Sequence, residues 1–201
     1  MLVVVTADQR HSRRGPDRVP AILDALRAVP TSPPHRGFER TAGDEVQGVL
    51  GHGDDVVAVL EQLLRHGGWR VGVGVGEVEH PLPRSTRAGR GAAFLHARDA
   101  VEAARSQPGR LAVRADDDVA AGRLETVVLL WADLLTRRTA AGWEVADLLA
   151  GGLTQPEVAN RLGVTQSAVS QRAATAAVSL SVRGGTLAAE MIDELVGGEP
   201  A

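Results

Sequence analysis

The sequence predicts an α+β protein in two parts, a sheet-containing domain over residues 1–115 and an all-α domain over residues 116–201. Three observations support this prediction. Short β-branched runs alternate with helical patterns up to residue 115, every later segment has a helical apolar period, and residues 154–180 carry a helix-turn-helix pattern. We therefore expect the order β–α–β–β–α–β–α–β in a mostly antiparallel sheet, followed by helices alone.

Local patterns place the first elements. Residues 2–7 form a short β-branched run without a helical period, which predicts a buried strand. Asp17 precedes a helical apolar period over residues 19–29, so we expect it to cap a helix there. Residues 40–51 are typical of a hairpin whose tight turn is Gly43–Glu45.

The rest of this domain centres on a strand with unusual alternation. A helix is expected over 51–68, between an Asp start and a Gly-Gly stop, and the strand follows over 69–79. One face of the strand lacks side chains, because valine alternates with glycine at positions 72, 74 and 76. Glycine there permits close approach by a helix or a ligand, or marks a tight packing seam. A helix over 91–106 and a strand over 111–115 complete the domain.

The second domain is expected to be helical throughout. Amphipathic helices are predicted over 120–138 and 140–152, with a break at 139–142. The helix-turn-helix follows, and a last helix over 186–198 ends at Gly-Gly.

Composition excludes several classes of protein. The 201 residues carry a formal net charge of −3, so any nucleic-acid contact must come from a local patch. The absence of cysteine excludes a disulfide framework, a cysteine zinc site and a thiol nucleophile. The first apolar run is too short for a signal peptide or a membrane span, so we expect a soluble, cytoplasmic protein without a membrane partner.

The helix-turn-helix is the more specific functional signal. Thr154 and Glu157 form a capping box, Gly163 lies where the turn needs a left-handed or tight backbone, and Val164 and Val169 point between the helices. The second helix would present short polar groups and one arginine to double-stranded DNA, so the DNA-binding candidates are Thr165, Gln166, Ser167, Ser170, Gln171 and Arg172. The alternative is a helical hairpin that packs on a partner. This half has few arginines, so DNA binding implies a homodimer.

Two carboxylates define a second candidate site. Asp8 ends the first strand and Asp44 lies on the hairpin turn, an arrangement that suits Mg²⁺ bridged to the phosphates of a nucleotide. The metal candidates are Asp8 and Asp44, and the nucleotide-binding candidates are Ser12, Arg13, Arg14, Glu45, Gln47 and Arg98. The alternative is that both acids serve turns and caps and that the arginines are solvated surface. The histidines show no metal-ligand spacing.

Five segments resemble the SatD family of bacterial proteins. Residues 43–50, GDEVQGVL, are similar to a GDEFQG-type turn, residues 70–78, RVGVGVGEV, to a RIGIGIGEI-like strand, and residues 89–104 to the following family helix. TADQRHSR over 6–13 resembles the IGDIxxSR-like start of the family. Residues 153–172 are similar to the LTQxEIAxxLGxSQSAVSQR helix-turn-helix with which family members often end, so the resemblance covers nearly the whole chain.

More distantly, the N-terminal segments are similar to the palm domain of class III nucleotidyl cyclases and GGDEF enzymes. The resemblance implies a ferredoxin-like, nucleotidyl-cyclase-like palm in which Asp8 and Asp44 hold metal against a nucleotide triphosphate. The cyclase helix carries an Asn and an Arg; the Asn position falls at about Leu95 here, and Arg98 or Arg105 would stand in for the Arg. A palm that keeps its metal acids but lacks these groups resembles a sensor more than an enzyme.

These observations favour a DNA-binding transcriptional regulator whose palm-like domain binds a nucleotide or similar ligand with a divalent metal. One alternative is an enzyme, a nucleotidyl cyclase or nucleotidyltransferase that the helix-turn-helix locates or dimerises. The other is a degenerate palm that serves only for dimerisation.

Overall fold

A five-stranded mixed sheet forms the N-terminal half of the protein. The computed structural model describes residues 1–197 apart from 13, 34 and 108. The strands are β1 (Leu2–Gln9), β2 (Arg36–Ala42), β3 (Glu45–Leu50), β4 (Trp69–Gly76) and β5 (Leu111–Arg114). Their order across the sheet is β2-β3-β1-β4-β5; only β4 and β5 pair in parallel, and the other three pairs are antiparallel. The prediction of an α+β domain with a mostly antiparallel sheet is therefore confirmed.

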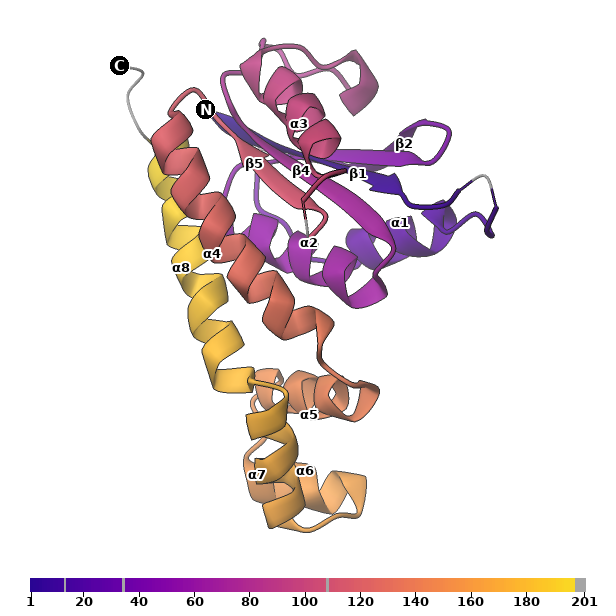
Figure 1. Cartoon of the computed structure of the whole chain (residues 1–201), viewed down its shortest axis with the longest axis vertical. Helices are drawn as coiled ribbons and strands as arrows, with labels where there is room; N and C mark the ends of the chain where they lie inside the picture. Colours follow the sequence, from indigo (N-terminus) through magenta and orange to yellow (C-terminus); the bar gives the residue numbers. More distant parts are fainter. Residues whose placement is uncertain (13, 34, 108, 198–201) are drawn as a thin grey trace.

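Helices cover both faces of this sheet. The helices α1 (Val19–Arg27) and α2 (Gly53–His66) lie on one face, and α3 (Ala92–Ala103) lies on the other (Figure 1). Alternate residues of β1 divide accordingly, because successive side chains of a strand point to opposite faces. Val3 and Val5 belong to the main core with α1 and α2, whereas Leu2 and Val4 pack in a smaller cluster with α3.

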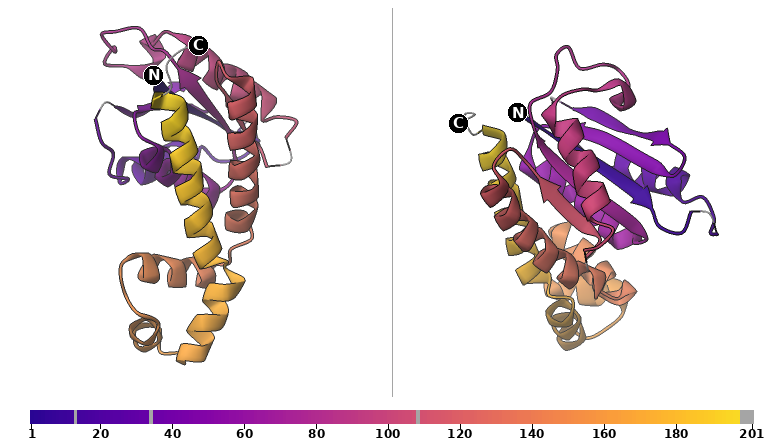
Figure 2. Two further views of the ribbon diagram at one scale, coloured as in Figure 1. Left: turned by 90° about the vertical axis from the view of Figure 1, so that its left-hand side faces the viewer. Right: turned by 45° about the horizontal axis from the view of Figure 1, so that its top comes forward.

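The C-terminal half is entirely helical. It comprises α4 (Asp118–Thr136), α5 (Ala140–Ala150), α6 (Gln155–Leu162), α7 (Gln166–Thr175) and α8 (Val178–Gly197). The long helices α4 and α8 run side by side in opposite directions along the flank of the sheet domain, and α5 to α7 lie together beyond their far end (Figures 1 and 2). None of the helices in the described part of the chain combines the length and hydropathy that a membrane span requires.

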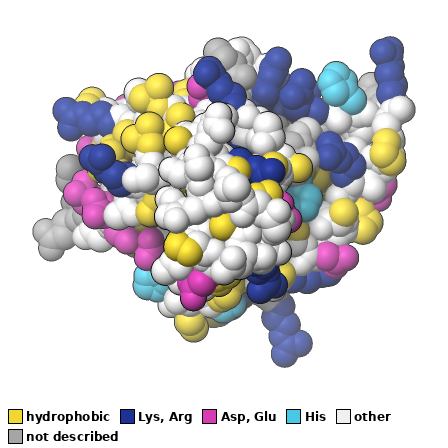
Figure 3. Space-filling view, turned by 90° about the horizontal axis from the view of Figure 1, so that it is seen from below, with side chains coloured by type: hydrophobic (Ala, Val, Ile, Leu, Met, Phe, Trp, Pro, Cys, Tyr) yellow, Lys and Arg dark blue, Asp and Glu magenta, His cyan; other side chains and the backbone are white. Residues whose placement is uncertain are grey.

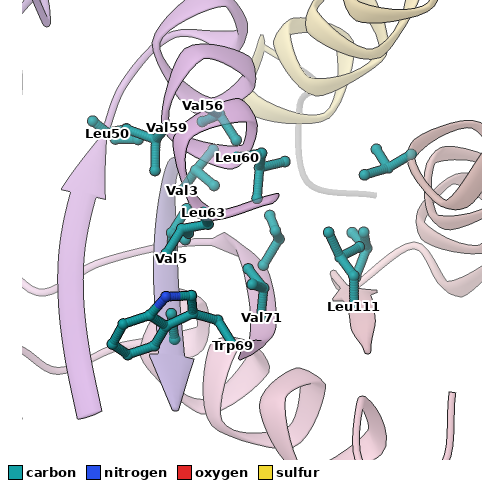
Figure 4. Packing of buried hydrophobic residues seen from close by; sticks show 14 of the residues in the cluster. Val3, Val5, Leu50, Val56, Val59, Leu60, Leu63, Trp69, Val71 and Leu111 are labelled. Carbon is teal, nitrogen blue, oxygen red and sulfur yellow. The ribbon is translucent and has the colours of Figure 1, made fainter. Parts of the chain in front are cut away.

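The two halves share one hydrophobic core. Figure 4 shows the part of it beneath the sheet, where side chains of α2 meet those of β1, β3, β4 and β5. The same cluster continues into the C-terminal helices through Leu124 and Val128 of α4 and Ile192 of α8, each at most 1% exposed. The pair α4–α8 and Trp143 of α5 are therefore anchored in the N-terminal core, whereas α6 and α7 pack in a separate cluster with Val145 of α5.

The glycine face of β4 exists because α3 packs directly on the strand backbone. A Cβ atom added at Gly74 would lie 2.1 Å from the backbone N of Ala97, and one at Gly72 would lie 2.3 Å from that of Val101. Of the alternatives for the glycine face, which were close approach by a helix, close approach by a ligand, or a packing seam, the structure shows close approach by a helix.

The last helix differs from its sequence-based expectation. The sequence predicted a helix from residue 186, yet α8 is continuous from Val178 through Gly184 and Gly185. A mid-helix glycine costs about 1 kcal/mol relative to alanine. Here the glycines permit Trp131 of α4 to approach, and its indole N–H donates to the carbonyl of Ser181 at 2.9 Å. Tertiary packing thus outweighs local propensity.

Candidate functional site

The two predicted metal acids lie together at one edge of the sheet. Asp8 is near the end of β1 and Asp44 lies on the β2–β3 turn, where Gly43 has the left-handed φ of 51° that such a turn needs. The amide of Gln9 donates to the carbonyl of Asp44 at 3.0 Å, which joins the turn to the strand. Both acids line an open cavity of about 820 Å³, whose other lining residues are Gln9, His11, Ser12, Arg14, Gly15, Asp17, Gly43, Arg70 and Arg105.

Arg70 is the immediate partner of Asp8. The two residues are opposite each other in the β1–β4 register, and Nη1 of Arg70 donates to Oδ2 of Asp8 at 2.6 Å. The side chains retain 25% and 19% exposure, so the pair lies at the mouth of the cavity rather than in the core. Nε of Arg70 is buried without a hydrogen-bond partner among the described residues, so one donor of this guanidinium is unused.

The site makes Asp8 easier to protonate than an ordinary aspartate. Burial raises the pKa of Asp8 and the nearby negative charge of Asp44 raises it further, whereas Arg70 and Arg105 act in the opposite direction and only partly offset this. A cation placed between Asp8 and Asp44 would remove that repulsion. The repulsion between the two carboxylates is therefore one feature that a bound cation would relieve, while Arg70 already neutralises part of the charge of Asp8.

We expect substitutions around Asp8 to move its pKa in opposite directions. Asp44→Asn removes a like charge and lowers the pKa of Asp8, whereas Arg70→Met removes a hydrogen bond and a positive charge and raises it. Carbon-13 NMR titration of the Asp8 carboxyl measures both shifts. Asp99→Asn, an exposed change on α3, serves as the control and leaves that titration unchanged. Equal titration curves in all variants would show that these groups do not share a site.

The donor set fits magnesium only together with a phosphate. Among the residues that the structure describes, no three His, Asp or Glu side chains converge to hold a metal ion by themselves. Magnesium commonly uses one or two carboxylates and completes its octahedron with water and substrate phosphates. Asp8 and Asp44 can supply those carboxylates, and Arg14, Arg70 and Arg105 provide charge for phosphate oxygens.

The structure brings together some of the predicted nucleotide-binding residues and not others. Ser12 and Arg14 line the cavity, whereas Arg13 lies outside the described residues. Among the described lining residues Arg105 takes the place expected for Arg98, which is exposed on α3. Glu45 accepts a hydrogen bond from Thr41, and Gln47 donates to Thr6 at 3.0 Å, so both are engaged beside the cavity.

Arg70 and His11 are cavity residues that sequence reasoning missed. The sequence did contain the information needed to find Arg70. It is two residues before Gly72 in the same strand, so its side chain must lie on the face of Gly72, Gly74 and Gly76. The helix α3 covers the glycines and leaves the position of Arg70 open to the cavity.

A second candidate site is the helix-turn-helix formed by α6 and α7. Glu157 accepts from the amide of Thr154 at 2.7 Å in the capping box, and Gly163 ends α6 with a left-handed φ of 64°. Val158 and Val169 are 0% exposed and pack with Val145 of α5. Each local prediction for this motif is confirmed, and α5 is the third helix of its core.

The outward face of α7 is polar. Gln166, Ser167, Ser170 and Gln171 are exposed, Arg172 is half-buried, and the hydroxyl of Thr165 accepts from the amide of Ala168 at 3.2 Å to cap the helix. Figure 3 views the molecule from this end; backbone and uncharged side chains predominate in the nearest region, with isolated charged groups. Such a face suits base edges in a major groove better than it suits a packed helical core.

Comparisons of the chain with protein-family models, with curated proteins and with solved structures find no match.

Proposed function

We propose that the protein is a DNA-binding transcriptional regulator whose N-terminal domain binds a nucleotide or related phosphate ligand with Mg²⁺. The observation that carries the proposal is the free, polar outer face of α7 on a complete helix-turn-helix. In this class of motif the second helix lies in the major groove and its side chains contact base edges. The unit formed by α5, α6 and α7 extends beyond the rest of the molecule, so no described element covers that face (Figure 1).

Selection from a random-sequence double-stranded DNA library tests this part of the proposal. We expect the full-length protein to enrich a defined sequence, with an affinity that falls steeply as salt rises because phosphate contacts release counterions. Failure to retain any DNA at low salt, with and without nucleotide and Mg²⁺, would contradict it and would favour a helical hairpin that packs on a protein.

The nucleotide part is supported by topology and by the cavity. The order β2-β3-β1-β4, with α1 and α2 on one face, is the order expected for a ferredoxin-like palm and supports this part of the proposal. In the palm of nucleotidyl cyclases, the end of the first strand and the hairpin turn carry the metal acids, the positions of Asp8 and Asp44 here. We also propose, from the same segments, that the chain is related to the SatD family. Leu95, which corresponds approximately to the cyclase Asn, is exposed and apolar, which favours a sensor over an enzyme.

Contacts between α2 and α5 provide a physical connection from the sheet domain to the DNA-binding unit. Arg65 of α2 forms a bidentate pair with Asp147 of α5, at 2.9 and 2.6 Å. Its guanidinium also lies over the Trp143 ring, 4.7 Å from the centroid, and Arg138 lies 4.4 Å from the same ring. A ligand regulates DNA binding through these contacts only if it has different affinities for two arrangements of the two units.

Thermal denaturation with nucleoside triphosphates and cyclic nucleotides tests the ligand site. We expect a nucleotide at a hundred times its Kd, with Mg²⁺, to stabilise the protein by about 2.7 kcal/mol. The Mg²⁺-dependent part should be lost in Asp44→Asn and retained in the control Asp99→Asn. Because the pKa of Asp8 is raised above 3.8 and its protonated form is a poor ligand, binding should begin to fail at a higher pH than for an ordinary aspartate as pH is lowered.

The outcome of that screen separates the alternatives. Release of pyrophosphate or a cyclic product from the stabilising nucleotide, abolished in Asp44→Asn, would establish an enzyme in place of a sensor. Absence of stabilisation by every nucleotide, with and without Mg²⁺, would contradict the ligand site and favour a palm that only supports dimerisation.

A further inference from the structure

We propose that a second copy of this chain docks on the outward face of the α4–α8 pair and forms a two-fold dimer with a four-helix interface. The surface of the monomer supports the contact itself. The direction of the two-fold axis, along the helix pair so that both α7 helices lie at the same end, rests on the proposed DNA binding.

The two helices expose apolar side chains that no described element covers. Val119 and Leu130 of α4 are 63% and 67% exposed, and Leu180 and Leu187 of α8 are 55% and 47% exposed. They account for four of the six large hydrophobic side chains that are exposed in the described part of the chain. Figure 2 shows α4 and α8 running together on an open flank. Exposed apolar side chains that are grouped on two neighbouring helices in this way are typical of an interaction site.

Helical spacing places the exposed apolar side chains of each helix on one side of that helix. Leu180 and Leu187 are two turns apart and therefore lie on one side of α8, as Leu130 and Leu134 do on α4. Trp131 contacts Gly184, which sets the two helices side by side at that level. We call this surface the stalk face; its exposed residues are Val119, Leu130, Leu180 and Leu187, and its half-buried residues are Val127, Leu134 and Met191, of which Val127 and Met191 also pack against the main core.

Charged residues of opposite sign border the stalk face at one level. Trp131 of α4 lies level with Gly184 of α8, and the two helices are antiparallel. Eight residues before Trp131 is Arg123, and eight residues after Gly184 is position 192, so Arg123 lies level with position 192. Glu190 and Glu194 flank that position. All three side chains are exposed, and none forms an ion pair within the described residues.

A two-fold rotation makes this arrangement self-complementary. When the two-fold axis is parallel to the helices, α4 of one copy packs against α8 of the other. The rotation does not change the height of any residue along the axis, so residues at the same height face each other. Arg123 of each copy then faces Glu190 and Glu194 of the other, and the apolar residues of the stalk face pack at the centre. Such an isologous contact buries the same patch on both copies, and antiparallel helices that pack in this manner form a four-helix bundle.

The charge of the DNA-binding unit also calls for two copies. Residues 154–180 contain only two arginines, Arg161 and Arg172, against Glu157. One copy can therefore make few phosphate contacts, and affinity for DNA falls with the number of phosphates neutralised. Two α7 helices at one end of a bundle would address two half-sites about 34 Å apart.

Sedimentation equilibrium of the full chain tests the contact without DNA. We expect the wild type to be a dimer and Leu130→Glu/Leu187→Glu to be a monomer with an unchanged circular dichroism spectrum. Leu95→Glu is the matched control, because Leu95 is 62% exposed on α3 and lies away from the stalk face; this variant should remain dimeric. A monomeric wild type at high micromolar concentration, or a dimer that survives the double substitution, would overturn the proposal.

A charge-reversal cycle tests the register. Arg123→Glu alone and Glu190→Arg/Glu194→Arg alone should each raise the dimer Kd by about tenfold or more, because they place like charges opposite each other. The triple variant restores the opposite-charge pairing and should return the Kd to within about threefold of wild type. Additive weakening in the triple variant would exclude this register.

The outcomes are separable from those of the proposed function. If the wild type is a dimer that these substitutions weaken, but it binds no DNA, the proposed interface is supported and the proposed role as a transcriptional regulator is contradicted. Sequence-specific DNA binding by a protein that is monomeric in solution would support the regulator and contradict the interface.

Discussion

Replacing Gly74 with alanine is expected to reduce the free energy of unfolding by about 3 kcal/mol, the upper part of the usual range for overpacking a protein core. The added Cβ would lie 2.1 Å from the backbone N of Ala97 and 2.3 Å from the carbonyl O of Ala93. Both are helix backbone atoms, so no side-chain rotamer change can relieve the overlap. The helix α3 must move away from β4, and this exposes part of the smaller core cluster around Ala93 and Ala97.

Urea denaturation followed by far-UV circular dichroism measures this effect, and a second glycine supplies the control. At Gly122, on the exposed side of α4, an added Cβ meets nothing within 4 Å. Gly122→Ala should therefore stabilise the protein by about 0.5 to 1 kcal/mol, since alanine is the better helix former. If Gly74→Ala proved as stable as wild type, the close packing of α3 on the glycine face would be disproved.

Replacing Gln171 with alanine is expected to reduce affinity for the selected DNA sequence at least about thirtyfold. A good bidentate contact between glutamine and adenine contributes about 1 to 3 kcal/mol, and a two-fold dimer loses two of them. Gln171 is exposed on α7, and Val169 in the core fixes the rotation of that helix. The variant should therefore retain its stability while losing discrimination at one base position in each half-site.

Fluorescence anisotropy with the selected DNA and with single-base variants of it measures affinity and discrimination together. Gln62→Ala, which removes a glutamine from α2 and leaves the helix-turn-helix intact, is the control for a general loss of glutamine. Arg172→Ala should behave differently from Gln171→Ala: it should weaken binding to all sequences and reduce the salt dependence, as loss of a phosphate contact does. Unchanged discrimination in Gln171→Ala would show that this side chain does not contact a base.

Most of the individual elements could be predicted because their signals are local. The alternation of Val71, Val73 and Val75 with glycine determines a strand whatever lies around it, and the capping box Thr154–Glu157 begins a helix within three residues of sequence. The same holds for Gly163 in the turn of the helix-turn-helix. In each case the interaction that stabilises the element joins residues that are close in the chain.

The candidate site could be predicted only in part, because a pairing of distant segments assembles it. That Asp8 and Asp44 would meet followed from their places at a strand end and at a turn. That Arg70 bonds to Asp8 depends on the β1–β4 register across 62 residues, and that Arg105 rather than Arg98 lines the cavity depends on how α3 lies across β4. Helical spacing alone leaves that orientation undetermined.

The sequence by itself determined the classes of the elements, the division into an α+β part and a helical part, and the residues of the helix-turn-helix. Only the tertiary structure decided that Gly184 and Gly185 continue α8 and that Arg70 forms an ion pair with Asp8. It also decided that α4 and α8 share a core with the sheet and expose apolar side chains on another side. The physical reason is the range of the interactions. Caps, turns and periodicity act within a few residues, whereas contacts such as Trp131 on α8 depend on packing between segments about fifty residues apart.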